Sequence, residues 1–279
     1  MKTTPLHSKN VKGTALVTGA SAGIGATYAE RLAQRGYNLI LVARDLQRLD
    51  SLAARLTQET GVRVETFKAD LVSKTDLARV EQRLRDDDQI SVLVNNAGMS
   101  AHGSLVGGDV DAHEAMIQLN VIAPTRLIAA IAPRFIARGT GTIINIASVL
   151  ALAPELFNGV YSGTKAYLLN LSLSLQKELG PKGVRVQAVL PGATRTEIWE
   201  KVGVDANQFP PGFVMEVDVM VDAALAGLDM GELVTIPPLP NVADFETFNN
   251  ARLALAPNLS KDKAADRYHP AQPAELAAA

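Results

Sequence analysis

The stretch TALVTGASAGIG, residues 14–25, decides the fold of this chain. It begins with a short apolar run that is typical of a buried β-strand and ends in a turn carrying Gly19, Gly23 and Gly25. The amphipathic pattern ATYAERLAQRG follows at once and predicts a helix that Gly36 ends. Glycines between a strand and a helix let the chain turn tightly and let a pyrophosphate approach the helix N-terminus. The GxxxGxG spacing differs from the usual GxGxxG fingerprint, so an ordinary glycine-rich turn is the alternative interpretation.

Six further apolar runs follow along the chain and alternate with helical patterns. They lie at residues 38–44, 63–70, 90–98, 141–148, 183–192 and 232–238. Continuous apolar runs are typical of strands covered on both faces, and their alternation with helices favours parallel pairing. The sequence therefore predicts an α/β fold, a three-layer Rossmann-type doubly wound parallel sheet of about seven strands with helices on both faces. Asp45 and Ser73 are expected to cap helices, and a helical region at 109–138 is expected to bend at Pro124.

Length and composition indicate one soluble globular domain. The chain has 279 residues, of which 47% are hydrophobic and 20% charged, and it shows no interdomain linker. We expect a single Rossmann-type domain over residues 1–279, with a core at 12–236. The remaining residues, 237–279, are rich in proline and alanine and are expected to form a C-terminal extension.

Charge and residue types exclude several classes of function. The formal net charge is -2 and no block of lysine and arginine occurs, so neither a nucleic acid nor a membrane is expected as a partner. The chain has no cysteine, which excludes disulfides, thiolate zinc sites and thiol nucleophiles and fits a cytoplasmic protein. No apolar run reaches the roughly 18 residues of a membrane-spanning helix. The four histidines are scattered, so surface or loop positions and no metal site are expected.

Chemistry is expected from the stretch SVLALAPELFNGVYSGTK, residues 148–165. Tyr161 and Lys165 stand four residues apart and would share one face of a helix. A nearby ammonium is expected to favour the phenolate and lower the pKa of Tyr161 from about 10. The hydroxyl of Ser148 would hold a carbonyl oxygen while Tyr161 gives it a proton, which is acid–base chemistry that needs a hydride partner. Because YxxxK pairs also occur by chance, a packed tyrosine beside a solvated lysine is the alternative for an isolated match.

The end of the second predicted strand bears on which dinucleotide binds. A carboxylate at this point would hold the ribose 2′-OH of NAD, whereas an arginine accommodates the 2′-phosphate of NADP. Arg44 stands there and Asp45 follows it. NADP(H) is therefore the expected cofactor and NAD is possible; in the alternative interpretation Arg44 is only a surface residue and Asp45 only a helix cap.

Taken together, the motifs resemble the short-chain dehydrogenase/reductase family in order and spacing over about residues 12–236. The matching residues are Thr18-Gly19-Ala20-Ser21-Ala22-Gly23-Ile24-Gly25, Asp70-Leu71, Asn95-Asn96-Ala97-Gly98, Asn120, Ser148, Tyr161, Lys165, Pro191-Gly192 and Thr194. In one respect the sequence departs from the pattern. Many NADP-preferring relatives carry a second basic residue within the glycine turn, and here that place holds Ala22.

The resemblance implies a cofactor site built from several loops. Asp70 and Leu71 would contact the adenine ring, and Asn96, Ala97 and Gly98 would line the adenosine and ribose side. The implied cofactor-binding residues are Gly19, Ser21, Ala22, Gly23, Ile24, Gly25, Arg44, Asp70, Leu71, Asn96, Ala97, Gly98, Tyr161, Lys165, Pro191, Gly192 and Thr194. The last three of these would seat the nicotinamide carboxamide.

The resemblance also implies four catalytic residues: Asn120, Ser148, Tyr161 and Lys165. Ser148 would orient the substrate oxygen, and Tyr161 would act as the general acid and base. Lys165 would bind the nicotinamide ribose, and Asn120 would hold a water that relays protons from it to solvent. A buried amide such as that of Asn120 must be paired in any case, because an unpaired one is costly inside an apolar helix.

The expected substrate is a small molecule with a carbonyl or a secondary alcohol and mainly apolar character. Apolar residues flank the catalytic positions in sequence, namely Met99, Leu150, Leu152, Pro154 and Phe157. The resemblance places a substrate lid at 195–213, which includes Trp199 and Arg195. Arg195 would recognise a carboxylate if one were present; the alternative is a solvated residue of the lid.

Two other functions stay open beside an NADP(H)-dependent oxidoreductase. One is alcohol oxidation with NAD, and the other is a dinucleotide-binding regulatory protein without turnover. The presence of Tyr161 and Lys165 favours an enzyme. The resemblance further implies a homodimer or homotetramer formed through the helices around 109–138 and 159–180.

Overall fold

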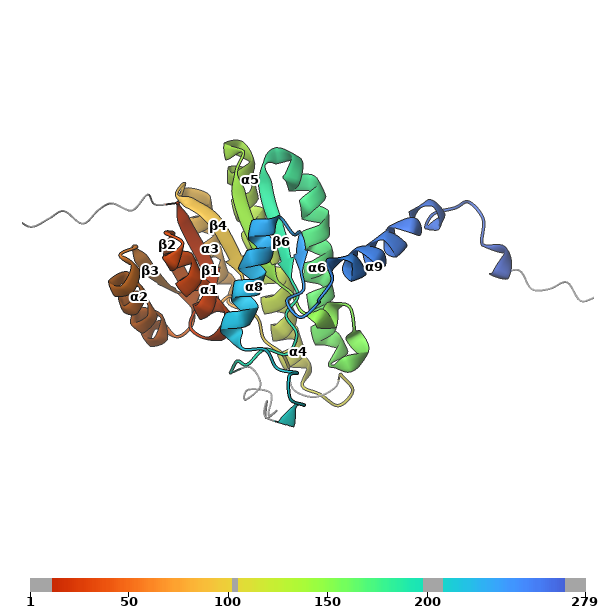
Figure 1. Ribbon diagram of the computed structural model, residues 1–279, viewed down its shortest axis with the longest axis horizontal. Helices are drawn as coiled ribbons and strands as arrows, with labels where there is room; N and C mark the ends of the chain where they lie inside the picture. The colour runs from red at the N-terminus through yellow and green to blue at the C-terminus, as the bar shows by residue number, and fades with distance from the viewer. Residues whose placement is uncertain (1–11, 102–104, 198–207, 269–279) are drawn as a thin grey trace, which may run out of the picture. The chain divides into compact units, whose positions relative to one another are not determined.

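The computed structural model describes residues 12–101, 105–197 and 208–268. The chain divides into two compact units, Met1–Pro238 and Leu239–Ala279. The first unit contains the whole sheet and all predicted site residues (Figure 1). The sequence predicts a C-terminal extension from residue 237, and the second unit begins at Leu239.

Seven strands form one sheet in the order β3-β2-β1-β4-β5-β6-β7, and every neighbouring pair is parallel. The predicted doubly wound fold is thus confirmed. The strands are β1 (Thr14–Thr18), β2 (Asn38–Ala43), β3 (Val64–Lys68), β4 (Ile90–Asn95), β5 (Gly141–Ile146), β6 (Val184–Val189) and β7 (Val234–Thr235). The last strand is shorter than the predicted run at 232–238, because two prolines follow and proline has no N–H for the ladder.

Helices cover both faces of the sheet, and a separate apolar cluster lies under each layer (Figure 1). One layer consists of α1 (Gly23–Gln34), α2 (Leu46–Thr60) and α8 (Val217–Met230). The other consists of α3 (Lys74–Asp86), α5 (Ala123–Arg138) and α6 (Gly159–Leu179). Because each strand is buried from above and below, its apolar residues need not alternate with polar ones.

The predicted helix caps are present. The side chain of Asp45 accepts a hydrogen bond from the backbone N–H of Arg48 at 3.0 Å, and Ser73 accepts one from Asp76 at 3.4 Å. At the other end of α2, Gly61 has a φ of 76°, a conformation that side chains disfavour. These local signals fix where α2 and α3 begin, and Gly61 is the residue at which α2 ends.

The long helical region at 109–138 is interrupted rather than bent at Pro124. It consists of α4 (Val110–Ile117), a π-helical segment at Gln118–Ile122, and α5. The wider π turn comes immediately before the proline and holds the buried Asn120. Such single turns of π-helix often occur at functional sites. The predicted irregularity is therefore present, but it lies a few residues earlier.

The segment Val110–Arg138 is long and apolar enough to cross a membrane by length and composition alone, with a mean hydropathy of 1.5. Its α5 portion packs against the sheet through buried residues such as Leu127, Ile131 and Phe135, which accounts for this composition. His113 on α4 corrects one sequence prediction, because it is buried and not at the surface. The other three histidines lie outside the described residues.

In the described part of the second unit, which ends at Tyr268, the chain forms one α-helix, α9 (Val242–Ala254), and two short 3-10 turns, Ala256–Asn258 and Asp266–Tyr268. None of the residues of α9 is buried. Large apolar side chains are exposed along this unit, among them Phe248, Leu255 and Leu259.

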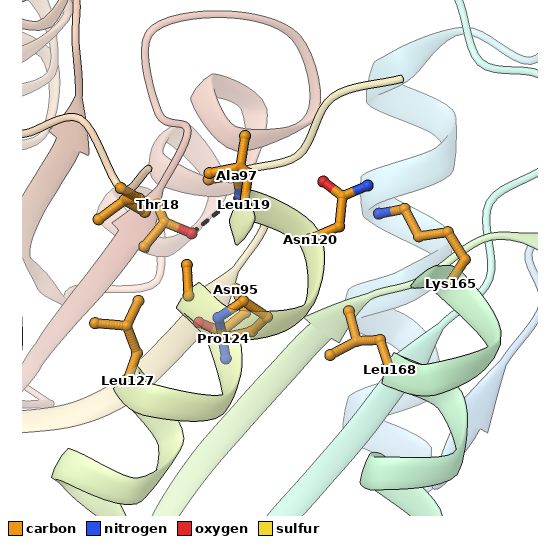
Figure 2. Close-up of a pocket in the computed structure, with 11 residues that line it drawn as sticks. Thr18, Asn95, Ala97, Leu119, Asn120, Pro124, Leu127, Lys165 and Leu168 are labelled. Atoms are coloured by element: carbon orange, nitrogen blue, oxygen red, sulfur yellow. Dashed lines mark hydrogen bonds between the residues drawn. The ribbon is translucent and has the colours of Figure 1, made fainter. Parts of the chain in front are cut away.

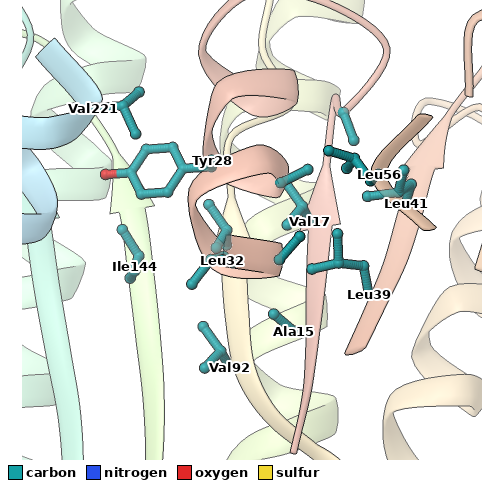
Figure 3. Close-up of a cluster of buried hydrophobic side chains, with 14 of the residues drawn as sticks. Ala15, Val17, Tyr28, Leu32, Leu39, Leu41, Leu56, Val92, Ile144 and Val221 are labelled. Carbon is teal, nitrogen blue, oxygen red and sulfur yellow. The ribbon is translucent and has the colours of Figure 1, made fainter. Parts of the chain in front are cut away.

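Tyr28 on α1 is the largest fully buried side chain of the first apolar cluster. Its ring lies between α1 and α8, and its hydroxyl points into the region of Val221 and Ile144 (Figure 3). The hydroxyl has no hydrogen-bond partner among the described residues, and burial raises the pKa of Tyr28 above its ordinary value. The ring thus contributes packing while its polar atom incurs a desolvation penalty.

Replacing Tyr28 by phenylalanine is expected to raise the free energy of unfolding by about 1 kcal/mol, since it removes a buried, unpaired hydroxyl. Replacing it by alanine should lower the same quantity by about 3–5 kcal/mol, because the ring leaves a cavity. Urea unfolding followed by circular dichroism measures both variants. A destabilised Tyr28→Phe protein would show that the hydroxyl has a partner after all.

Candidate active site

The helix α6 begins at a strong cap and carries the predicted catalytic pair on its first turns. The side chain of Asn158 accepts hydrogen bonds from the backbone N–H groups of Val160 at 2.9 Å and Tyr161 at 3.1 Å. The Lys165 ammonium lies 5.7 Å from the centre of the Tyr161 ring. The rings of Phe157 and Tyr161 meet in a T-shaped arrangement with 5.8 Å between centroids. Tyr161 therefore has both an ammonium and a second aromatic ring as neighbours.

Ser148 stands just beyond the carboxyl end of β5, where open α/β sheets bind their ligands. The backbone on either side of it is fixed to the β6 side of the sheet. Ala147 donates to the Val189 carbonyl at 2.8 Å, and Val149 donates to the Pro191 carbonyl at 3.0 Å. The Ser148 hydroxyl accepts from the backbone N–H of Leu150 at 3.2 Å, and it lies near enough to the Tyr161 hydroxyl to lower the pKa of that group slightly. The structure thus brings together the two hydroxyl groups that the sequence predicts to act on one oxygen atom.

The Lys165 side chain is buried, and its ammonium donates a hydrogen bond to the Ile146 carbonyl at 2.9 Å. Asn120, in the π-helical segment, lies beside it (Figure 2). The Asn120 amide accepts from Met99 N–H at 3.0 Å and donates to Met99 O at 2.8 Å and to Thr164 Oγ1 at 3.1 Å. All of the amide's polar atoms are therefore paired, and the residue ties the loop after β4 to α6. Thr164 is a contributor that the sequence interpretation missed, because no short motif links it to residue 120.

The pKa values of the pair differ from those expected. Removal of water around the hydroxyl raises the pKa of Tyr161 to about 12, and the nearby Ser148 hydroxyl only partly opposes this. Burial lowers the pKa of Lys165 to about 8. The prediction that Lys165 lowers the pKa of Tyr161 is thus wrong for this structure, because desolvation dominates and the ammonium bonds to a backbone carbonyl instead. At neutral pH the tyrosine holds its proton and can donate it.

The glycine turn between β1 and α1 fits a dinucleotide pyrophosphate. Gly19 and Gly23 have φ values of 65° and 53°, which residues with side chains rarely adopt. A Cβ atom built at Gly25 would lie 2.3 Å from the Gly19 carbonyl oxygen. Ala22 stands at the N-cap of α1 and offers no side-chain cap. The N–H groups of the first helical turn are left for an anion.

The loop after β4 holds the glycine turn in place through hydrogen bonds. Asn96 donates through its side chain to the carbonyl oxygens of Thr18 at 2.9 Å and Gly19 at 3.2 Å. Thr18 Oγ1 accepts from the backbone N–H groups of Asn96 and Ala97, both at 3.0 Å, and donates to Val94 O at 3.1 Å. The Asn96 side chain is therefore engaged with the glycine turn.

Gly98 lies on the catalytic side of the site. A Cβ atom built there would lie 3.2 Å from Asn120 Oδ1 and 3.5 Å from Lys165 Nζ. The three predicted residues after β4 thus divide between two tasks. Asn96 and Ala97 hold the glycine turn, and Gly98 leaves room next to the buried lysine.

The residues expected at the adenosine end follow β2 and β3. Arg44 is exposed directly after β2 and forms no ion pair with any described residue. Asp70 follows β3, and its side chain accepts from the Val72 N–H at 3.1 Å, while its own N–H donates to Asp76 at 3.0 Å. Leu71 is buried beside it. The structure thus places Arg44 and Asp70 at the ends of adjacent parallel strands.

The segment after β6 runs past the glycine turn. Thr194 is buried, donates to the Gly192 carbonyl at 3.1 Å, and pairs with Met215 in an isolated parallel bridge. Thr196 lies against the turn, because a Cβ atom at Gly23 would meet its methyl group at 3.2 Å. The sequence interpretation missed Thr196, although it follows Thr194 by two residues. Trp199, in the predicted lid, lies outside the described residues.

A cavity of about 10 Å³ lies between these elements, near the size that one water needs. Figure 2 shows its lining, in which Asn120 and Lys165 approach one another from the π-helical segment and α6. The residues that line it are Thr18, Leu71, Asn95, Ala97, Leu119, Asn120, Ala123, Pro124, Leu127, Lys165 and Leu168. Within the described ranges, no three histidine, cysteine, aspartate or glutamate residues gather as ligands for a metal ion.

A doubly wound sheet whose first turn accepts a pyrophosphate, with a serine at the end of β5 and a tyrosine and a lysine on the following helix α6, defines the class of nicotinamide-nucleotide oxidoreductases. The family model described as short chain dehydrogenase matches residues 13–207. The chain therefore belongs to the short-chain dehydrogenase family, whose enzymes act on CH–OH and C=O groups.

Individual relatives agree with this assignment. A short-chain dehydrogenase from Sphingobium yanoikuyae, solved in complex with NADPH, is 55% identical, with a TM-score of 0.90 over 92% of this chain and 100% of that one. A bulky-bulky ketone specific alcohol dehydrogenase from Comamonas testosteroni is 50% identical, with a TM-score of 0.85 over 92% and 99%. An uncharacterized oxidoreductase of Staphylococcus saprophyticus is 37% identical over 66% of this chain and 79% of its own length.

Because Lys165 is buried, the difference in the free energy of unfolding between the wild type and a Lys165→Met variant is expected to depend on pH. The folded pKa is about 8 against an ordinary 10.5. Between these values the unfolded chain binds more protons than the folded chain, so wild-type stability rises with pH relative to the variant. The full rise is about 3 kcal/mol, at about 1.4 kcal/mol per pKa unit.

Urea unfolding at several pH values measures this difference. Below about pH 8 the difference in the free energy of unfolding should be constant. Between about pH 8 and pH 10.5 the wild type should become more stable relative to the variant. The control is Lys177→Met, since Lys177 lies exposed on the same helix. Its difference from wild type should not change over this range, and a flat profile for Lys165→Met would contradict the burial of its charge.

Proposed function

We propose that this protein is an NADP(H)-dependent oxidoreductase that interconverts an uncharged, mainly apolar ketone or aldehyde and the corresponding alcohol. The observation that carries the proposal is the buried ammonium of Lys165, which donates to the Ile146 carbonyl at the carboxyl end of β5 and lies 5.7 Å from the centre of the Tyr161 ring. A regulatory protein without turnover would have no need to keep an ammonium buried next to a tyrosine, at the cost of its desolvation.

In the proposed mechanism the bound cofactor supplies a hydride to the carbonyl carbon. Ser148 holds the carbonyl oxygen, and Tyr161 gives it the proton that completes the alcohol. A phenol with a raised pKa is protonated at neutral pH, so it can act as the acid in the direction of reduction. Lys165 would hold the nicotinamide ribose through its ammonium. Asn120, whose amide joins the loop after β4 to Thr164 on α6, would hold the water that relays protons from Lys165.

The preference for an apolar substrate is supported by the residues around Tyr161. Phe157 packs against the Tyr161 ring in a T-shaped arrangement and is partly exposed, and Leu156 is 76% exposed. Leu150 and Leu152 belong to the turn that Ser148 begins. The relative from Comamonas testosteroni is described as specific for bulky-bulky ketones, and such a substrate suits this open apolar surface.

Recognition of a substrate carboxylate by Arg195 is not favoured. Its guanidinium donates to Glu216 Oε1 at 2.8 Å, and its backbone N–H donates to Met215 O at 2.9 Å. The ion pair joins the two ends of the segment after β6. Arg195 therefore stabilises the segment after β6, and this role agrees with an uncharged substrate.

The choice of NADP(H) over NAD(H) is supported by Arg44, whose exposed guanidinium forms no ion pair with any described residue, and by the NADPH complex of the 55% identical relative. We further propose a cytoplasmic homodimer or homotetramer. Exposed apolar side chains on α4, the π-helical segment and α6 support self-association, namely Val110, Ile117, Ile122 and Tyr167. The absence of cysteine agrees with a reducing compartment.

Replacing Tyr161 by phenylalanine should lower kcat by about 100-fold or more, because it removes the proton donor. NADPH binding, followed by cofactor fluorescence, should stay within about threefold of the wild type if the hydroxyl acts in chemistry and not in binding. The assay is NADPH-dependent reduction of a panel that runs from small charged ketones to ketones with two bulky apolar groups. Turnover confined to the charged members would contradict the proposed substrate class.

Replacing Arg44 by alanine should weaken NADPH binding about tenfold or more and leave NADH binding nearly unchanged, because only NADP(H) carries the 2′-phosphate. Side-by-side titrations of the wild type and the variant measure both affinities. If the wild type binds NADH as well as NADPH, the proposed cofactor preference is wrong.

A further inference from the structure

Arg48 lies at the adenosine end of the site, in the first turn of α2. Its backbone N–H donates to Asp45 Oδ1 at 3.0 Å, and its Nε lies 3.5 Å from Asp45 Oδ2. Since Asp45 directly follows Arg44, the Arg48 guanidinium stands beside the end of β2, where a doubly wound fold binds the adenosine ribose. Arg44 and Arg48 thus stand on either side of Asp45 in the short stretch that joins β2 to α2, and the Asp45 carboxylate contacts Arg48.

The Arg48 guanidinium also forms an ion pair with Glu197, which lies far along the chain in the segment after β6. Nη1 of Arg48 lies 2.7 Å from Glu197 Oε1 and 2.9 Å from Oε2. Both side chains are about half exposed, at 50% and 41%. Glu197 follows Thr196, which lies against Gly23 of the glycine turn. The ion pair therefore joins the adenosine end of the site to the segment that runs past the pyrophosphate turn.

In the absence of a cofactor, the positive and negative side chains at the adenosine end of the site are equal in number. Arg44 and Arg48 supply two positive charges, and Asp45 and Glu197 supply two negative ones. A ribose 2′-phosphate brings up to two further negative charges. An approaching phosphate would be repelled by Glu197 while Arg48 remains paired with it, and would gain a second guanidinium if Arg48 changed partner. The glycine turn supplies no such cation, since Ala22 stands there.

We propose that Arg48 exchanges Glu197 for the 2′-phosphate when NADPH binds, and that it reads this phosphate together with Arg44. Arg48 is then a second specificity residue, and Glu197 is its counter-ion in the free protein. NADH has no 2′-phosphate and leaves the ion pair of Arg48 and Glu197 intact. The inference rests on the proposed preference for NADP(H) and deepens it.

The test is a pair of titrations, with NADPH and with NADH, on the wild type and three variants. Arg48→Ala should weaken NADPH binding about tenfold or more, because a charge-assisted contact is lost, and should leave NADH binding within about twofold. Glu197→Gln should tighten NADPH binding by about threefold, the scale of an exposed ion pair, without affecting NADH. In the double variant the gain from Glu197→Gln should vanish, since it acts through Arg48.

The matched control is Arg55→Ala. Arg55 lies on the same helix, is 47% exposed and pairs with Glu30 and Glu59. Its loss should change neither affinity, because it stands away from the end of β2. A thermal unfolding scan of each variant shows that the fold is kept, as expected for exposed ion pairs.

Three outcomes would overturn the exchange. Arg48→Ala could weaken NADPH and NADH equally, which would make Arg48 a support for the segment at Glu197. Arg48→Ala could keep the full NADPH preference of the wild type, or Glu197→Gln could weaken NADPH binding. The proposed function fails separately: a wild type that does not prefer NADPH contradicts it directly, whereas a preference lost with Arg44→Ala but kept with Arg48→Ala contradicts the exchange alone.

Discussion

The site depends on one electrostatic constraint, which is that the ammonium of Lys165 lies inside the protein. A charge in that place must be paired, and its pairing dictates the surroundings. The strand β5 ends so that the Ile146 carbonyl accepts from it. Gly98 carries no side chain that would crowd it, and the π turn brings Asn120 alongside. The helix α6, capped by Asn158, carries Lys165 one turn after Tyr161. Segments from four parts of the chain therefore meet around a single nitrogen atom.

The cofactor side is organised by hydrogen bonds of a different kind, between loops and not around a charge. The hydroxyl of Thr18 uses its donor and accepts twice, and the amide of Asn96 holds the carbonyls of the glycine turn. The turn is thus rigid before any ligand arrives, which lowers the conformational entropy that binding would cost. At the adenosine end the contacts are exposed ion pairs, which exchange partners more easily. The site is thus rigid at the glycine turn, where the pyrophosphate common to NAD(H) and NADP(H) is expected to bind. It is adaptable at the adenosine end, where the two cofactors differ.

Much of this arrangement could be predicted from the sequence. The seven apolar runs predict the sheet, because a strand buried on both faces is apolar along its whole length. Asp45, Ser73 and Gly61 mark the ends of helices. Contacts between distant residues could not be predicted in this way. Nothing local indicates that Asn120 pairs with Met99 and Thr164, or that Arg48 meets Glu197. The pKa of Tyr161 was also missed, because spacing predicts which charge is near but not how much water is removed.

The ends of the sheet have a consequence for the behaviour of the protein at high concentration. An exposed edge strand can pair with an edge of another molecule and begin aggregation. Here β7 has only two residues and is followed by Pro237 and Pro238, which cannot donate to a ladder. At the opposite edge, β3 carries Glu65 and Lys68, and Glu65 is held by Arg83 at 2.5–2.8 Å. Both edges are thus poor templates for strand addition, which lowers the tendency of the folded chain to aggregate through its sheet.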